Sequence, residues 1–188
     1  LAGEGAIVLS MMAGVELASL AARFPRAAAH VRVMPNLAAA LGKSPLALAG
    51  VDLDDSVRTA ITQFVAPLGS SEWIAENLFD LVTALAGSGP AFVYRFIDAL
   101  ASGAENLGME RAQADRLALA MVEGASALAA ASDVAPVELA RRVTSPGGTT
   151  AAGLQVMDAD GALADLVEAT LKAAADRGAE MAAVARQG

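Results

Sequence analysis

The stretch Gly89–Leu107, GPAFVYRFIDALASGAENL, marks the start of the helical half of the chain. Pro90 suits the first turn of a helix, because an amide at that position has no partner within the helix. The apolar side chains after it recur every three or four residues and share one broad face. They are Phe92, Val93, Phe96, Ile97, Leu100, Ala104 and Leu107. This pattern predicts a long helix that packs along one side.

Beyond this stretch the spacing of apolar residues predicts helices only. These helices are expected at residues 110–131, 136–143, 149–157 and 162–186. Strand signals already stop at about Glu76. We therefore predict an all-helical domain over residues 76–188.

Before Glu76, short apolar runs alternate with helical segments. Strands are expected at residues 6–10, 31–34, 46–49 and 71–74, and helices at residues 14–24 and 55–65. Strands that alternate with helices along a chain form parallel sheets. Residues 1–75 are therefore predicted to form a parallel α/β domain.

The composition argues against several classes of function. The chain has no cysteine and one histidine, His30, which excludes disulfides, thiolate metal sites and histidine clusters. A net charge of −8, with basic residues scattered, disfavours nucleic-acid binding. No apolar run reaches the roughly 18 residues of a membrane span, and Glu4 stands where a signal peptide would be basic. We expect a cytoplasmic protein with no metal site.

Much of the 55% hydrophobic content is alanine. Helices faced with alanine approach closely but bury little area each, so they gain by packing against a second subunit. We therefore expect a homodimer or a higher homo-oligomer. Met109, Met121 and Met157 are expected to fill its core.

The segment Val143–Thr150, VTSPGGTT, separates two predicted helices. Its Pro-Gly-Gly turn lets the backbone approach a ligand closely. The next helix directs its first unpaired N–H groups to the same place, and such a helix end prefers an anion. The alternative is an ordinary turn in which Thr149 or Thr150 caps that helix.

This segment resembles the signature of pyrroline-5-carboxylate reductases. Gly87–Tyr94, GSGPAFVY, and Val31–Asn36, VRVMPN, resemble two further family segments in the same order and at similar separations. The resemblance spans nearly the whole chain. It implies part of a Rossmann-like nicotinamide dinucleotide-binding sheet over residues 1–75, followed by a helical domain that binds substrate and forms an interwoven dimer. The implied reaction is hydride transfer from NADPH or NADH to the C=N bond of 1-pyrroline-5-carboxylate, which gives L-proline.

The resemblance also implies which residues form the site. Thr150 is the implied catalytic residue, and its hydroxyl orients the imine or relays a proton from water, since a threonine is a poor acid. The implied substrate-binding residues are Ser145, Gly147, Gly148, Thr149 and Thr150. The implied cofactor-binding residues are Ala13, Gly14, Met34, Pro35, Asn36, Gly87, Ser88, Gly89 and Pro90.

Each cofactor-facing segment also has a plain structural interpretation. The Gly87–Pro90 turn suits a capped helix start, Met34–Asn36 suits a strand end, and the residues before Gly14 suit a core. The family usually continues after the asparagine with a threonine and a proline, where this chain has Leu37 and Ala38.

No Gly-x-Gly-x-x-Gly turn, which takes the cofactor pyrophosphate in Rossmann-like domains, occurs in the sequence. We therefore expect these residues to be the C-terminal two thirds of such a reductase and to be inactive alone. The alternative is a non-catalytic oligomerisation or binding module derived from the family. A different dehydrogenase with a helical second domain is disfavoured by the Ser-Pro-Gly-Gly-Thr-Thr loop. The sequence does not discriminate between NADPH and NADH.

Overall fold

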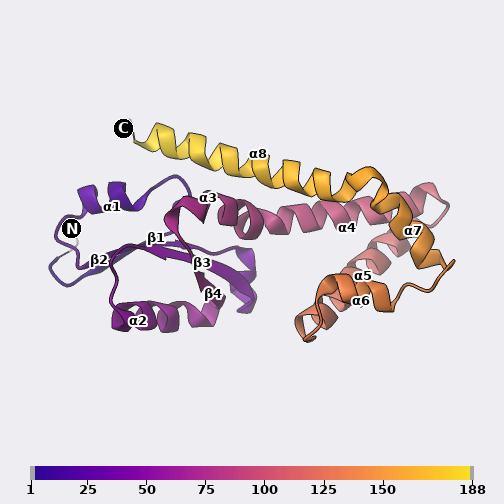
Figure 1. Cartoon of the computed structure of the whole chain (residues 1–188), viewed down its shortest axis with the longest axis horizontal. Coiled ribbons are helices and arrows are strands. Elements are labelled where there is room, and N and C mark those ends of the chain that lie inside the picture. Colours follow the sequence, from indigo (N-terminus) through magenta and orange to yellow (C-terminus); the bar gives the residue numbers. More distant parts are fainter. Residues whose placement is uncertain (1–2, 187–188) are drawn as a thin grey trace. The chain divides into compact units, whose positions relative to one another are not determined.

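The computed structural model of the chain describes residues 3–186, which form two compact units. The first unit combines the chain up to Pro90 with the chain from Ala169 onward, and the second is Ala91–Glu168. Strands lie in the first unit and helices alone form the second (Figure 1). The units divide after Pro90 because residues 76–90 pack on the sheet, although their composition is already helical.

The first unit contains a four-stranded sheet in the order β1-β2-β3-β4. Its strands are β1 (Ile7–Ser10), β2 (Ala29–Met34), β3 (Ser44–Gly50) and β4 (Gly69–Trp73). All four predicted strands are present, each within about two residues of its expected ends. The α/β class predicted for this half is therefore confirmed.

The sheet is mixed, so the prediction of parallel pairing throughout is wrong. β1 pairs with β2 in parallel and β3 with β4 in parallel, but β2 and β3 run antiparallel with Val31 opposite Gly50 and Met34 opposite Ala47. The reason is the connection between β2 and β3, which holds only the short 3-10 helix η1 (Leu37–Leu41). A parallel return needs a crossover of about a dozen residues or more, usually a helix.

Side chains alternate across the sheet and supply two cores. On one face Val31, Val33, Leu46 and Leu48 pack with Ile61 and Val65 of α2 (Asp55–Val65). On the other face Met34, Ala47 and Ala49 pack with Phe79 of α3 (Phe79–Val82). Figure 1 shows α2 and α3 on opposite sides of the strands. Helices cover both faces, so the middle of β2 is fully buried.

The remaining helices follow the sequence closely. They are α1 (Leu17–Arg23), α4 (Gly89–Asn106), α5 (Arg111–Ala130), α6 (Pro136–Arg142), α7 (Thr149–Met157) and α8 (Ala162–Ala185). Short 3-10 turns lie at η2 (Ala66–Leu68), η3 (Glu76–Leu78) and η5 (Ala159–Gly161), and a π-helical segment, η4 (Thr83–Gly87), joins α3 to α4. Within residues 3–186 no helix is long and apolar enough to cross a membrane.

The second unit has a small core of its own. Its buried residues are Ala101, Ala114 and Ala118, and Ile97, Leu100 and Ala104 pack against them at half-buried positions. Arg111, the first residue of α5, joins that helix to α4 through a bond to Asp98 at 2.8 Å, and it also bonds Asp115 within α5 at 2.8 Å. The hydrogen bond from Arg111 lowers the pKa of the Asp98 carboxyl.

Large apolar side chains stay exposed on this unit. Met121 is 50% exposed, Met109 40% and Met157 38%, so the prediction that these methionines fill a core is wrong for the single chain. The helical spacing was right, but a face that is apolar in sequence needs a partner surface to become a core.

Candidate functional site

The loop after β2 is held by Asn36. Asn36 precedes η1, and its Oδ1 accepts a hydrogen bond from the Ala38 N–H at 2.8 Å, the geometry of a helix N-cap. Its own backbone N–H donates to the Ser44 hydroxyl at 2.9 Å, and its side-chain Nδ2 donates to the Ala86 carbonyl at 2.8 Å. Asn36 therefore connects the end of β2 to the segment that precedes α4.

The Gly87–Pro90 segment is helical and not an open turn. The Ser88 N–H donates to the Thr83 carbonyl at 2.9 Å, a five-residue step of the π type, and α4 follows from Gly89. A Cβ at Gly87 would lie 3.6 Å from Met34 Cγ, which places the two predicted segments side by side. A Cβ at Gly89 would meet no atom of the described chain within 4 Å. The packing of this chain therefore does not require glycine at position 89.

The loop after β1 is held by a buried arginine, Arg32, in the middle of β2. Its Nη2 donates to the Ala13 carbonyl at 2.6 Å, and its Nη1 lies 3.3 Å from Glu76 Oε1. The same Glu76 oxygen accepts the Leu17 N–H at 2.7 Å. The guanidinium also lies 3.8 Å above the centre of the Phe79 ring, and Arg32 is 2% exposed. Arg32 thus holds the middle of the loop between β1 and α1, and Glu76 holds the first residue of α1.

Neither Arg32 nor Glu76 was singled out from the sequence. The available signal was an arginine between valines in a strand predicted to lie inside a sheet, since a charge buried there must have partners. Position 76 could not be linked to it, because the two residues are 44 positions apart and no sequence pattern pairs them. The Arg32 Nε is buried and has no hydrogen-bond partner in the described structure.

Gly14 is explained by the packing of the chain itself. A Cβ there would lie 3.2 Å from the backbone carbon of Met181 and 3.3 Å from the Ala182 nitrogen, both in α8. Arg186, the residue after α8, forms an ion pair with Glu16 at 2.6 Å. The glycine therefore allows the C-terminal end of α8 to lie against the loop (Figure 1).

The three segments with predicted cofactor residues lie together in the first unit. Met34 lies beside Gly87, Asn36 binds Ala86, and Arg32 of the same strand binds Ala13. Strands β1 and β2 are parallel, so their carboxyl ends share one edge of the sheet. Ligands of open α/β sheets bind at such an edge.

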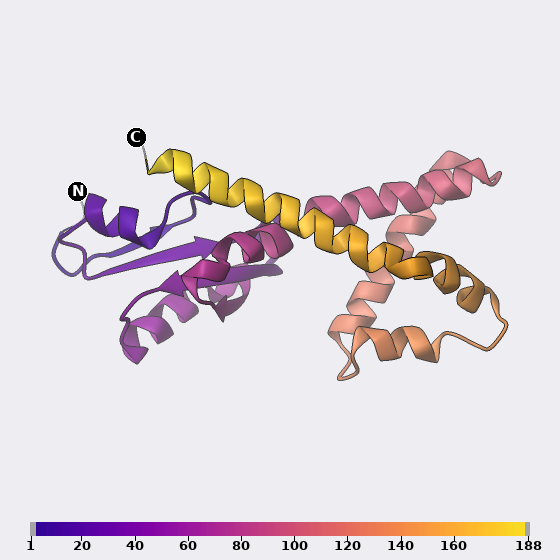
Figure 2. The ribbon, with the colours of Figure 1, turned by 45° about the horizontal axis from the view of Figure 1, so that its top comes forward.

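The predicted substrate residues lie in the second unit, in the connection between α6 and α7 and at the start of α7 (Figure 2). Gly147 has a positive φ of 70°, and Gly148 is the N-cap of α7 with no side-chain capping bond. Thr149 and Thr150 are the first two helical residues, so the alternative in which one of them is the cap is wrong. A Cβ at Gly148 would meet the Ser145 hydroxyl, so the glycine lets that side chain keep the position it has here. Ser145, Thr149 and Thr150 are exposed.

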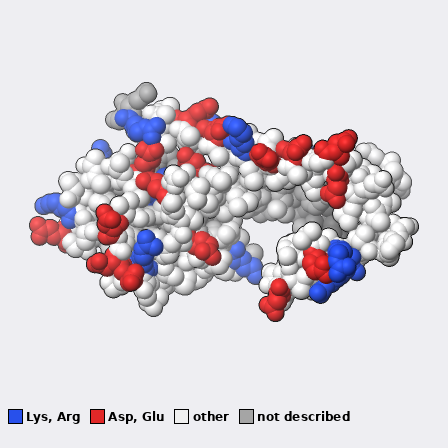
Figure 3. Space-filling model, in the orientation of Figure 1, with Lys and Arg blue, Asp and Glu red and all other residues white. Residues whose placement is uncertain are grey.

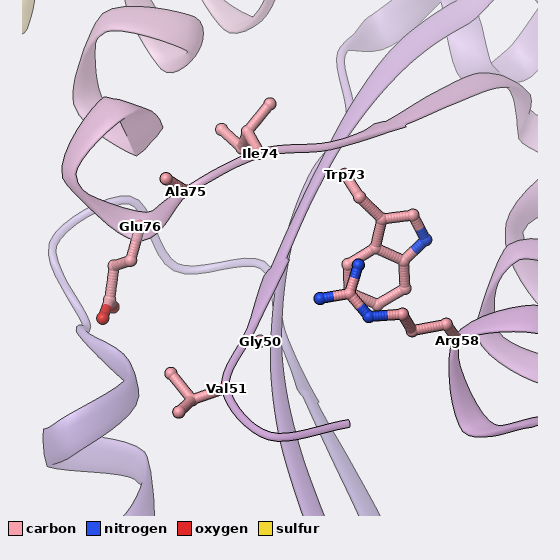
Figure 4. Close-up of a pocket in the computed structure, with 7 residues that line it drawn as sticks. All are labelled: Gly50, Val51, Arg58, Trp73, Ile74, Ala75 and Glu76. Atoms are coloured by element: carbon pink, nitrogen blue, oxygen red, sulfur yellow. The ribbon is translucent and has the colours of Figure 1, made fainter. Parts of the chain in front are cut away.

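A separate cavity of about 430 Å³ contains none of the predicted site residues (Figure 4). It is lined by Gly50, Val51, Arg58, Trp73, Ile74, Ala75 and Glu76. The Arg58 guanidinium lies 4.8 Å from the centre of the Trp73 ring. Gly50 lies opposite Val31, near the start of β2, and not opposite the end of that strand. The cavity therefore lies away from the carboxyl end of β2, where the segments with predicted cofactor residues meet.

Charges are mixed on the face shown in Figure 3, where basic groups are scattered among acidic ones. Within residues 3–186, no group of three or more His, Cys, Asp or Glu side chains is placed to hold a metal ion.

The chain was compared with known families, proteins and structures. A family model described as pyrroline-5-carboxylate reductase dimerisation matches residues 76–181, more than half of the chain. This chain belongs to the pyrroline-5-carboxylate reductase family. The family resemblance drawn from the three motifs is therefore confirmed.

Curated relatives and solved structures agree with this family. The chain is 41% identical over 156 residues to the pyrroline-5-carboxylate reductase of Aquifex aeolicus, covering 82% of this chain and 59% of the relative. The identity to the Pseudomonas aeruginosa reductase is 38% over 178 residues, covering 94% and 65%. A structure of the Coxiella burnetii reductase superposes with a TM-score of 0.87 at 30% identity, covering 93% of this chain and 65% of that one. The chain thus spans less than two thirds of these relatives.

A further structure shares the fold at lower identity. It is a pyrroline carboxylate reductase from Plasmodium falciparum with NADP bound, with a TM-score of 0.80, 24% identity, and coverage of 94% of this chain and 71% of that chain. The predicted fold class, a partial Rossmann-like sheet followed by a helical dimerisation region, is confirmed by these neighbours.

Proposed function

We propose that the protein reduces 1-pyrroline-5-carboxylate to L-proline with NADPH or NADH. The observation that carries this proposal, beyond family membership, is the meeting of three predicted segments at one sheet edge of the first unit. Met34 lies against Gly87, Asn36 binds Ala86 and Arg32 binds Ala13. Gly89 at this edge faces open space, as a glycine does where a ligand must approach the backbone.

The edge suits the nicotinamide end of the cofactor. The proposed cofactor-binding residues are Ala13, Gly14, Met34, Pro35, Gly87, Ser88, Gly89 and Pro90, and Asn36 belongs to the same edge through its hydrogen bond to Ala86. When bound, NADPH or NADH supplies the hydride that reduces the C=N bond. The residues of this chain orient the ring and exclude water from it. The NADP in the Plasmodium falciparum structure makes NADPH the first cofactor to test.

The loop Ser145–Thr150 suits the substrate carboxylate. The first N–H groups of α7 have no partner within the helix and prefer an anion. We assign the carboxylate to Ser145, Gly147, Gly148 and Thr149, and the ring nitrogen to the Thr150 hydroxyl. Thr150 is exposed, so its hydroxyl is free to orient the imine or to relay a proton from water.

Thr150→Ala is expected to lower kcat of the active enzyme at least about tenfold, because a positioned proton-transfer group contributes on the order of 100-fold or more. The midpoint of thermal unfolding should not move, since the side chain is exposed. Thr150→Ser, which keeps the hydroxyl, should restore most of the turnover. Unchanged kinetics in Thr150→Ala would remove this residue from the mechanism.

We also propose that the helical domain, residues 76–188, forms a homodimer, and that residues 1–75 belong to the dinucleotide-binding domain. On α5, Leu117, Met121 and Leu128 form an exposed stripe, being 59%, 50% and 63% exposed. Such a stripe on a helix fits a second copy of an alanine-rich bundle. By the resemblance, helices of one subunit complete the substrate pocket of the other.

Activity is proposed to require the strand and glycine-rich turn that take the pyrophosphate, which this sequence does not contain. The test is oxidation of NADPH and of NADH with 1-pyrroline-5-carboxylate, by the 188-residue chain and by a chain extended upstream through that turn. Activity in the extended chain alone would support the proposal. Absence of activity in both would favour the non-catalytic oligomerisation module instead.

A further inference from the structure

Ala86, in the π-helical segment η4 just before α4, has a carbonyl without the usual helical donor. In an α-helix the carbonyl of Ala86 would accept the N–H of residue 90, four positions later. Residue 90 is proline and has no N–H. The Asn36 amide takes this place, with Nδ2 donating to the Ala86 carbonyl at 2.8 Å. The donor comes from the loop after β2, 50 residues earlier in the chain.

The orientation of the Asn36 amide is determined by its partners. Oδ1 accepts from the Ala38 N–H at 2.8 Å, while Nδ2 faces a carbonyl that can only accept. A flipped amide would place oxygen against oxygen and N–H against N–H, so one orientation alone satisfies both. The Ser44 hydroxyl, on a fully buried residue, also accepts the Asn36 backbone N–H at 2.9 Å. Asn36 is therefore anchored at three points before any ligand is present.

We propose that Asn36 is a positioning residue, which supplies the hydrogen bond that Pro90 cannot and thereby fixes the Gly87–Pro90 segment against the end of β2. The part of this inference that concerns the cofactor rests on the proposed function. The Asn36 side chain then acts on the nicotinamide site through the Ala86–Pro90 backbone. This differs from the sequence expectation, in which Asn36 faces the cofactor itself.

The test is a cycle of Asn36→Ala and Pro90→Ala, singly and together. Alanine at position 90 restores an N–H that can donate to the Ala86 carbonyl. In the 188-residue chain, Asn36→Ala should raise the equilibrium constant of unfolding on the order of fivefold or more, as expected for a lost hydrogen bond at a half-buried group. In the Pro90→Ala background the same substitution should have a clearly smaller effect. An equal effect in both backgrounds, or none in either, would overturn the proposal.

Two further variants separate the amide from other effects. Asn36→Asp keeps the oxygen that accepts the Ala38 N–H but loses the donor to the Ala86 carbonyl. It should therefore destabilise the folded chain even though the N-cap remains. Pro136→Ala changes a proline in the first turn of another helix, α6, and should leave the cost of Asn36→Ala unchanged. If Asn36→Ala does not fold, recovery of folding by Pro90→Ala supports the proposal, and failure to recover overturns it.

Steady-state kinetics of the active enzyme test whether Asn36 acts on the nicotinamide site. Asn36→Ala should raise KM for NADPH several-fold while KM for 1-pyrroline-5-carboxylate stays within about twofold, and the NADPH effect should shrink in the Pro90→Ala background. An effect on NADPH that Pro90→Ala does not reduce would mean that Asn36 touches the cofactor directly, and would overturn the positioning role. Coupling in the unfolding cycle without any reductase activity would instead retain the positioning role and reject the proposed function.

Discussion

The two units of this chain bury their side chains in different ways. In the first unit Leu46, Leu48, Val31 and Phe79 are at most 2% exposed, and the buried Arg32 forms an ion pair with the half-buried Glu76. In the described part of the second unit the residues that are buried are three alanines, while leucines and methionines of α5 are half exposed or more. A sheet covered by helices on both faces encloses its core within one chain. The alanine-rich helices of the second unit leave their larger apolar side chains exposed within one chain.

Phe79→Ala should show the largest effect, because it removes a fully buried ring from the first unit. We expect the free energy of unfolding to fall by about 3–5 kcal/mol. Urea denaturation followed by circular dichroism measures this change. Phe96→Ala is the matched control in the second unit, where the ring is 44% exposed. The loss of unfolding free energy caused by Phe96→Ala should be small in dilute protein and should grow with protein concentration. Equal costs for both at every concentration would contradict the comparison.

Glu76→Ala should be nearly as costly, since it leaves the Arg32 guanidinium buried without its carboxylate. Removing one partner of a buried pair typically costs about 3–5 kcal/mol. Because Glu76 is a third exposed, we expect the lower end of that range. Glu76→Gln keeps an oxygen for the Leu17 N–H and should cost less.

The control for Glu76→Ala is Glu138→Ala in the second unit, which breaks the exposed pair between Glu138 and Arg141. Exposed pairs contribute little, so its unfolding curve should match that of the unchanged chain. A loss as large as that of Glu76→Ala would show that burial does not distinguish the two pairs.

Leu117→Glu combined with Leu128→Glu should weaken the proposed dimer. Each leucine is worth about 1.5–3 kcal/mol when buried, so the two charges together should raise the dimer dissociation constant at least about 100-fold. Sedimentation velocity at micromolar protein measures this shift. Phe64→Glu, at an exposed aromatic residue of the first unit, should leave the assembly unchanged. A chain that is monomeric before any substitution would refute the dimer.

The smallest expected effect is on the stability of the protein at acidic pH. Arg111 lowers the pKa of Asp98 below its ordinary value of 3.8, so the folded state binds fewer protons than the unfolded state in that range. The stabilisation by Asp98 is therefore present above pH 4 and is lost as pH falls through the lowered folded pKa. Asp98→Asn should lower stability at pH 6 and flatten its fall between pH 4 and pH 2.5. If stability falls as steeply in Asp98→Asn as in the unchanged chain, other groups cause the acid sensitivity.

Local patterns predicted the elements of both units well. The apolar spacing after Pro90 located α4, and the turn residues of the Val143–Thr150 loop located the start of α7 at Thr149. The alternation of strands and helices does not predict the direction of β3, because the short connection after β2 forces antiparallel pairing there.

The site residues show that local sequence patterns do not predict contacts between distant residues. Gly14 was assigned to the cofactor, yet its close neighbours in this chain are Met181 and Ala182 in α8. Arg32 received no role of its own, although it joins the loops that begin at Ala13 and at Glu76. In each instance the partner is distant in sequence, and periodicity reports only neighbours within a few residues.

The amino-acid sequence was sufficient for the family, for the order of the strands and helices, and for the positions of the three motifs, because these depend on residue type and short spacing. The fold was needed to pair Asn36 with Ala86, Arg32 with Glu76 and Gly14 with α8. These pairs form only when the chain brings distant residues within a few ångströms, where hydrogen bonds and packing act.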